Sequence, residues 1–109
     1  MKHALGELEQ TILLAVVRLG DEAYGVSIRR EIALCTRREI APGALYTTLD
    51  RLQQKGMLEA RDGDPTPERG GRAKRFYKLT REGQGLLVEA QRSFQSLMQG
   101  LDLLHRTNR

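Results

Sequence analysis

Basic side chains gather in one stretch of the chain, and this pattern points most clearly to a chemistry. Residues 69–81 contain six basic residues and no acidic one: Arg69, Arg72, Lys74, Arg75, Lys78 and Arg81. Closely spaced positive charges attract phosphate groups, because a phosphate backbone releases its counterions when it is neutralised. The segment is therefore a candidate site for a nucleic-acid backbone, although a solvated basic loop would have the same composition.

Residue types that carry catalysis or bind metals are sparse. His3 and His105 lie at opposite ends of the chain, and Cys35 is the single cysteine. No set of residues has the spacing of metal ligands, and no nucleophile stands in a recognisable motif beside a base. The glycines at 70–71 lack the lysine-containing pattern of a phosphate-binding P-loop. We therefore expect no enzyme activity, no metal and no cofactor.

The composition indicates one small globular domain. The chain has 109 residues, of which 39% are hydrophobic and 29% charged, with a net charge of +4. No apolar run approaches the roughly 20 residues that a membrane helix requires, and the N-terminus lacks the pattern of a signal peptide. One cysteine rules out an internal disulfide and fits a reducing compartment. We therefore expect a cytoplasmic protein without membrane contact.

Three helices are expected before the basic stretch. Apolar residues at helical spacing predict helices over 7–19, 24–35 and 42–55, with Gly20 and Gly56 ending the first and the third. The second helix is predicted to bury Tyr24, Ile28, Ile32 and Cys35, and the third to bury Ala41, Leu45, Leu49 and Leu52.

The basic stretch falls in a predicted β-hairpin. Residues 57–62 and 73–79 alternate in polarity, and a stretch rich in Pro and Gly separates them. Tyr77 and Leu79 are expected to face inward. Gly25, near the start of the second helix, is expected to allow close approach of another backbone.

The last predicted helix carries an apolar stripe. Thr80 suits its N-cap, and apolar residues recur at spacings of 3, 4, 3, 4 and 3 as far as residue 104. Such an a/d stripe is typical of a helix that pairs with another helix. We expect it to form a dimer interface made by Leu87, Ala90, Phe94, Leu97, Met98, Leu101 and Leu104.

The order of these elements predicts the fold. Three helices, a hairpin and a long helix make a mainly α fold with a small β-hairpin, the layout of a winged helix-turn-helix. Residues 1–80 would form the DNA-binding domain, with the wing at about 58–79, and residues 81–109 the C-terminal dimerisation helix. The third helix would lie in the major groove of double-stranded DNA, and the wing would reach the neighbouring backbone.

Three motifs resemble those of the PadR family of transcriptional regulators. Residues 43–52, Gly-Ala-Leu-Tyr-Thr-Thr-Leu-Asp-Arg-Leu, followed by residues 55–58, are similar to its G-x-L-Y-x-x-L-x-R-L…G-x-L signature. Residues 70–80 resemble its G-R-x-R-x-Y-x-L-T pattern, and residues 24–28 resemble its Y-G-x-x-I pattern. The resemblance implies a homodimeric repressor, of the short type with one helix after the wing.

The residues expected to contact DNA lie on the third helix and the wing. They are Gly43, Tyr46, Thr47, Arg51, Arg69, Arg72 and Lys74. Without the resemblance, the residues alone would favour a half-buried structural role for Tyr46. Gly43 could equally serve helix initiation, and Arg51 could pair with a nearby acid. Arg72 and Lys74 alternate along the second strand, so both are expected on one face, away from Arg75.

Two further possibilities stay open. The fold could be a protein interaction module without DNA binding of its own, which the uncompensated basic residues at 69–81 disfavour. A small apolar or aromatic effector could bind at the dimer interface beside Phe94 and Met98, although the chain has no Trp to line such a pocket.

Overall fold

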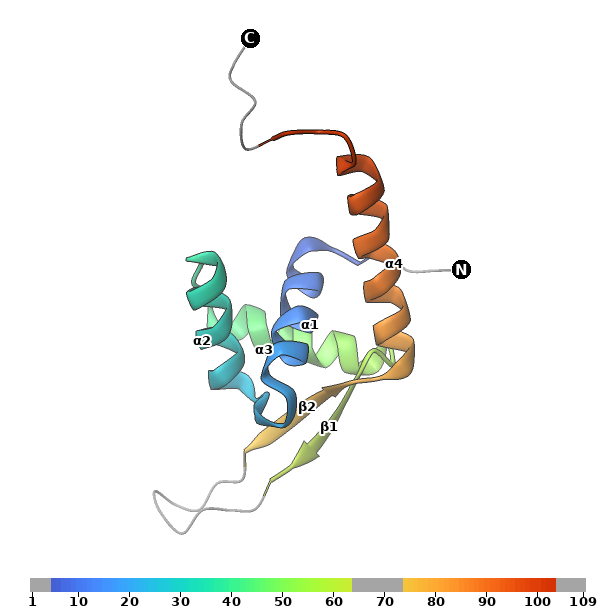
Figure 1. The fold of residues 1–109 in the computed structure, drawn as a ribbon. Helices are drawn as coiled ribbons and strands as arrows, with labels where there is room; N and C mark the ends of the chain where they lie inside the picture. The colour runs from blue at the N-terminus through green and yellow to red at the C-terminus, as the bar shows by residue number, and fades with distance from the viewer. Residues whose placement is uncertain (1–4, 64–73, 104–109) are drawn as a thin grey trace.

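A computed structural model describes residues 5–63 and 74–103 of the chain. Three helices are followed by an antiparallel hairpin and a fourth helix, which is the predicted order (Figure 1). The elements are α1 (Glu7–Leu19), a 3-10 turn (Gly20–Glu22), α2 (Gly25–Thr36), α3 (Pro42–Gln54), β1 (Leu58–Asp62), β2 (Arg75–Leu79) and α4 (Arg81–Met98). The predicted fold class, mainly α with a small hairpin, is confirmed.

Glycines set two of the helix ends as expected. The backbone of Gly20 has a φ of 60°, and that of Gly56 has a φ of 80°, so both lie in the region that L side chains rarely adopt. Helix α1 has its predicted bounds, and α3 ends at Gln54, one residue before the predicted end. Helix α2 is shifted by one residue because Tyr24 is its extended N-cap.

The core lies around α1, which runs through the middle of the molecule in Figure 1. Its buried side chains come from every helix and from the hairpin: Ile12, Leu13, Ala15, Val16, Ala23, Ile28, Ile32, Ile40, Leu45, Leu49, Leu52, Met57, Leu58, Tyr77 and Leu87. In the central turns of α2 and α3, the residues predicted to face inward belong to this cluster, so that prediction is confirmed there.

Two residues at helix ends were predicted to be buried and are exposed. Ala41 is the extended N-cap of α3, and its side chain therefore lies outside the helical face that continues through Leu45. Cys35 lies in the last turn of α2, beyond the contact between Ile32 and the core. In both cases the apolar spacing in the sequence extends beyond the part of the helix that packs against other elements.

A third segment joins the hairpin. In the antiparallel register, Arg61 lies opposite Phe76 and Ala60 opposite Tyr77. The backbone N–H of Tyr77 also donates to the carbonyl of Ala23 at 2.8 Å, and Tyr24 forms an isolated bridge with Phe76. The start of α2 is therefore held along β2, and Tyr77 is buried, as predicted.

Helix α4 begins as predicted but ends early. The Thr80 hydroxyl accepts a hydrogen bond from the backbone N–H of Gly83 at 3.0 Å, so Thr80 is the N-cap. The helix stops at Met98 because Gln99 is extended and Gly100 has a φ of 83°. Leu101 thus lies beyond the helix, contrary to the predicted stripe, and Leu104 lies outside the described residues.

The stripe of α4 also divides between two environments. Leu87 is buried in the core of its own chain, which leaves little of its side chain for the predicted dimer interface. Phe94, Leu97 and Met98 are exposed, on the part of α4 that extends past the other helices in Figure 1. None of the helices in the described ranges is long and apolar enough to cross a membrane.

Candidate nucleic-acid interface

Helix α3 separates a buried face from an exposed polar face. Leu45, Leu49 and Leu52 are fully buried, because spacings of four and three residues place them on one side of the helix. The opposite side is exposed, and it contains Gly43, Tyr46, Thr47, Asp50, Arg51 and Gln54. The four α3 residues predicted to contact DNA therefore share one accessible surface.

Tyr46 is the aromatic residue of this surface, and it rests on the first turn of α2. A Cβ atom added to Gly25 would lie 2.6 Å from Cζ of Tyr46 and closer still to its hydroxyl. The Tyr46 side chain is nevertheless 45% exposed, so one side packs on α2 while the other faces solvent. The group that approaches Gly25 is thus a side chain, whereas the sequence suggested another backbone.

Gly43 lies near the N-terminus of α3, directly after Pro42. Nothing lies within 4 Å of the position that its Cβ would occupy, so packing within the chain does not demand glycine there. Free backbone N–H groups at a helix N-terminus favour anions. A phosphate could approach this backbone closely, which keeps Gly43 a candidate contact.

The hairpin supplies two described cations at the start of β2. The Lys74 ammonium lies 4.5 Å from the ring centroid of Tyr24. The guanidinium of Arg75 lies on the other face, with Nη2 3.4 Å from Oε1 of Gln53 in α3. Arg69 and Arg72, the other two predicted wing contacts, lie outside the described residues.

Arg75 is the candidate that sequence reasoning missed. The prediction favoured the strand face of Arg72 and Lys74 because both are basic. Arg75 shares its face with Tyr77, which is buried toward the helices, so Arg75 lies beside α3. The alternation from Tyr77 back to Arg75 was the signal that could have identified it.

Charged groups of both the helix and the hairpin lie near the phenol of Tyr77. Burial raises the pKa of the Tyr77 phenol; the nearby Asp50 carboxylate and Tyr46 raise it further, while Arg75 lowers it. Tyr77 is therefore a neutral phenol at neutral pH. The contact between Arg75 and Gln53 brings the start of β2 close to the C-terminal part of α3.

The C-terminal end of α3 is tied to α1 by a partly buried ion pair. Lys55, directly after α3, places Nζ 3.1 Å from Oε2 of Glu9, whose other oxygen accepts the N–H of Gly6 at 2.9 Å. Burial raises the pKa of Glu9, but the hydrogen bonds from Gly6 and Lys55 and the charges of Lys55 and Arg51 outweigh burial and lower it overall. The carboxylate stays charged and anchors α3.

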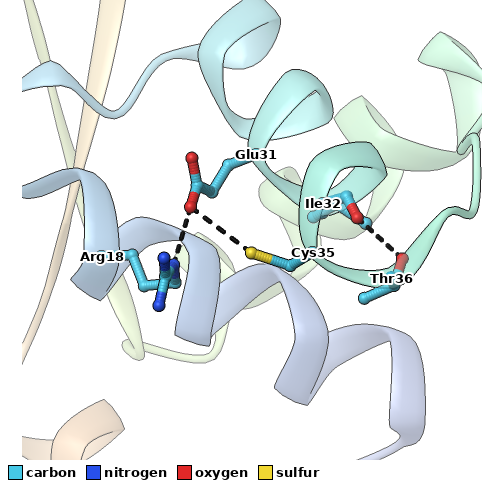
Figure 2. A network of polar contacts seen from close by, with 5 residues as sticks. All are labelled: Arg18, Glu31, Ile32, Cys35 and Thr36. Carbon is cyan, nitrogen blue, oxygen red and sulfur yellow. Dashed lines mark hydrogen bonds and ion pairs between the residues drawn. The ribbon is translucent and has the colours of Figure 1, made fainter.

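Cys35 takes no part in this surface. Figure 2 shows Arg18 of α1 and Cys35 of α2 both directed at the carboxylate of Glu31. Nε of Arg18 lies 2.7 Å from Oε2 of Glu31, and Sγ of Cys35 donates to the same oxygen at 3.5 Å. The network joins the ends of α1 and α2. Among the described residues, no three His, Cys, Asp or Glu side chains gather as a metal site would require.

Comparison of the chain with known proteins identifies its family. The sequence model of the "Transcriptional regulator PadR-like family" matches residues 13–89. That range contains α2, α3, the hairpin and the start of α4. The chain belongs to the PadR-like family. It is therefore a transcriptional regulator with a DNA-binding winged helix rather than an enzyme, as the sequence predicted.

Individual PadR-like relatives agree with this assignment. The chain is 35% identical to the transcriptional regulator Rv3488 of Mycobacterium tuberculosis over 79 residues, 71% of this chain and 67% of the relative. A PadR-like transcription factor from Bacteroides fragilis is 28% identical, with a TM-score of 0.66 over 83% of this chain and 82% of that one. A winged-helix DNA-binding protein from STIV shares the fold at 21% identity, with a TM-score of 0.69 over 96% of this chain and all of that one.

Proposed function

We propose that this PadR-like protein represses transcription as a homodimer bound to a pseudo-palindromic operator. The observation that supports the proposal is the exposed polar face of α3 together with Arg75, which joins the basic start of β2 to Gln53 of α3. In this arrangement α3 enters the major groove, and the wing, defined as the β1–β2 hairpin, contacts the adjacent phosphate backbone. Repression, rather than activation, is taken from the resemblance to the family.

The residues proposed to contact DNA divide by chemistry. Thr47 and Arg51 stand one turn apart on the exposed face of α3, where they can reach base edges or phosphates. Gly43 and Tyr46 offer a backbone N–H and a phenol to the phosphates beside the groove. On the wing, Lys74 and Arg75 bind phosphates, and Arg69 and Arg72 remain predicted contacts.

A second copy of the chain is the proposed partner of the exposed apolar surface. Leu14 and Val17 of α1 are 39% and 52% exposed, and Phe94 and Leu97 of α4 are 54% and 74% exposed. Monomeric proteins rarely leave so many large apolar side chains accessible on neighbouring helices. We propose that α1 and the C-terminal half of α4 form the dimer interface, with Ala90, Met98, Leu101 and Leu104 at its margins.

The same interface is where a small effector would bind. The space between two α4 helices would be lined by Phe94 and Met98 together with residues of α1. Such a site would suit a small apolar or aromatic molecule. A thermal-shift screen in which no compound of this kind stabilises the protein would remove this part of the proposal.

Selection of bound duplexes from a random DNA library tests the proposed function directly. We expect enrichment of an inverted repeat whose half-sites lie about one helical turn, roughly 34–36 Å, apart. Binding to the enriched duplex should weaken steeply with salt, with a log–log slope of about −0.9 per neutralised phosphate. A single enriched half-site would refute the dimeric readout. Absence of binding at any salt concentration would instead favour a protein interaction module.

A further inference from the structure

Four side chains from three segments form a stack at the base of the wing. The rings of Tyr24 and Phe76 meet edge to face, with their centroids 5.6 Å apart and an angle of 66° between their planes. A cation covers each ring: Cζ of Arg61 lies 4.7 Å from the Phe76 centroid, and Nζ of Lys74 lies 4.5 Å from the Tyr24 centroid. The order across the stack is cation, ring, ring, cation.

Backbone contacts support the stack from both sides. Tyr24 bridges Phe76, and the N–H of Tyr77 donates to the Ala23 carbonyl, so residues 23–24 act as a short third strand along β2. On the other edge of β2, Arg61 lies opposite Phe76 in the hairpin register. The side chains of Tyr24, Phe76 and Arg61 thus lie in a row across three neighbouring strands. Side-chain pairs between neighbouring strands are what stabilises a sheet.

The Phe76 ring also covers the end of the described hairpin. A Cβ atom on Gly63 would lie 2.6 Å from Cε2 of Phe76, so the ring lies directly on the backbone of residue 63. The N–H of Gly63 donates to the carbonyl of Lys74 at 2.7 Å and closes the two strands at this point. Phe76 therefore packs against both strands of the wing as well as against Tyr24.

The two residues at the start of α2 connect both DNA-contacting elements. Tyr24 packs on the wing through Phe76, while the next residue, Gly25, receives the side chain of Tyr46 from α3. Both contacts belong to the first turn of one helix. Residues 24–25 therefore form a second link between the wing and α3, beside the direct connection through Met57 and the contact of Arg75 with Gln53.

We infer that the Tyr24–Phe76 ring pair is a positioning device that fixes the angle between the wing and α3. The inference rests on the proposed function for its consequence on DNA: a fixed angle holds the phosphates bound by the wing in register with the bases read by α3. Neither ring needs to touch DNA. Lys74 is held over the Tyr24 ring, which restricts its rotamers and directs a proposed phosphate contact.

Two pairs of variants distinguish the effect of the aromatic ring from the effect of an apolar side chain at the same position. Tyr24→Leu and Phe76→Leu remove one ring each, whereas Tyr24→Phe and Phe76→Tyr keep it. Val26→Ala is the matched control, because Val26 is a 49% exposed neighbour in the same turn of α2 and lies outside the stack. Melting curves establish that each variant is folded.

The angle is measured first on protein without DNA. Residual dipolar couplings of the amides of β2 and of α3 report their relative orientation. In the two leucine variants, we expect that one alignment no longer fits the couplings of both β2 and α3. In the ring-retaining variants and in Val26→Ala, one alignment should still fit both elements. An unchanged relative orientation in both folded leucine variants would overturn the inference, whether or not the protein binds DNA.

The consequence for DNA is then read by hydroxyl-radical footprinting on the selected duplex. We expect the leucine variants to bind about fivefold to tenfold more weakly, to lose protection of the wing-side phosphates and to keep protection of the major-groove site. Tyr24→Phe should restore the wild-type footprint. Uniform weakening with an unchanged footprint would show that the rings serve stability alone and would overturn the positioning role. If the wild-type protein binds no duplex, the proposed function fails, and the couplings alone decide the inference.

Discussion

The phenol of Tyr46 fills the space that a side chain at Gly25 would occupy. An added Cβ would lie 2.6 Å from Cζ of Tyr46 and 2.8 Å from Cε1, well inside contact distance. The contact joins the exposed face of α3 to the first turn of α2, and it orients a tyrosine whose other side is open to solvent. If Tyr46 contacts DNA as proposed, stability and DNA binding are coupled at this one position.

Substitution of Gly25 by Ala should affect both properties. The methyl group must displace the Tyr46 ring, which we expect to cost about 1–3 kcal/mol of unfolding free energy and to weaken DNA binding. Chemical denaturation and a binding titration measure the two effects. Gly85→Ala is the matched control: its Cβ meets nothing within 4 Å, so it should stabilise α4 by about 0.5–1 kcal/mol and leave binding unchanged. Equal stability of Gly25→Ala and the wild type would contradict this packing.

Gly43→Ala should separate DNA binding from stability. Open space surrounds the position, so the folded protein should be as stable as the wild type or slightly more stable. If the backbone of residue 43 approaches a phosphate, the added methyl group should cost about 1 kcal/mol of binding, the worth of one hydrogen bond. Unchanged affinity for the selected duplex would remove Gly43 from the interface and leave it a role in helix initiation.

These two glycines illustrate what the sequence can predict. Local signals were sufficient for α1, because the apolar spacing stops at Gly20, and for the hairpin, because alternation and turn residues coincide. The contacts of Tyr46 with Gly25 and of Lys55 with Glu9 join residues far apart along the chain, and no local periodicity encodes them. Glu9 illustrates the limit: in the sequence it is one more acidic residue in the first turn of α1, and its burial follows from how α3 packs on α1.

The same limit explains the errors at helix ends. A helical stripe extends as far as apolar residues recur, but burial extends only as far as a neighbouring element does. Cys35 and Ala41 both lie past that point and are exposed. On α4 the stripe crosses Gly100, whose backbone conformation ends any helical continuation toward Leu101.

The Glu9–Lys55 ion pair predicts a pH-dependent stability. The pKa of Glu9 in the folded protein is below the ordinary value of 4.5, so the charged carboxylate is favoured by folding. This contribution is fully present above the ordinary value and is lost as the pH falls through the lowered pKa. Glu9→Gln should therefore destabilise the protein by about 1–2 kcal/mol at pH 7, and by less as the pH falls below the ordinary value and through the lowered pKa.

Urea denaturation of the wild type and of Glu9→Gln across this pH range measures the difference. Glu7→Gln is the control, because the Glu7 carboxylate is exposed and its ion pair with Arg38, at 3.4 Å, is exposed as well. A constant difference between Glu9→Gln and the wild type from pH 7 to pH 3 would show that packing, rather than charge, accounts for the effect.

Leu97→Ser should dissociate the proposed dimer without unfolding the chain. Leu97 is 74% exposed, so the loss of its side chain should change the stability of the single chain by less than about 0.5 kcal/mol. Burial of a leucine contributes about 1.5–3 kcal/mol, and each subunit would lose one, so the dimer should weaken strongly. Sedimentation equilibrium measures the shift. Leu34→Ser, equally exposed but on α2, should leave the association constant unchanged; equal effects of both variants would refute an α4 interface.

The first turn of α4 packs tightly against residues 56–57. Gly83 lies so close to the Met57 backbone that a Cβ would meet its carbonyl, and the Thr80 hydroxyl donates to the Gly56 carbonyl at 2.6 Å. Met57 immediately precedes β1, the first strand of the wing. A tilt of α4 about its first turn would therefore press on Met57, the residue through which the chain enters the wing.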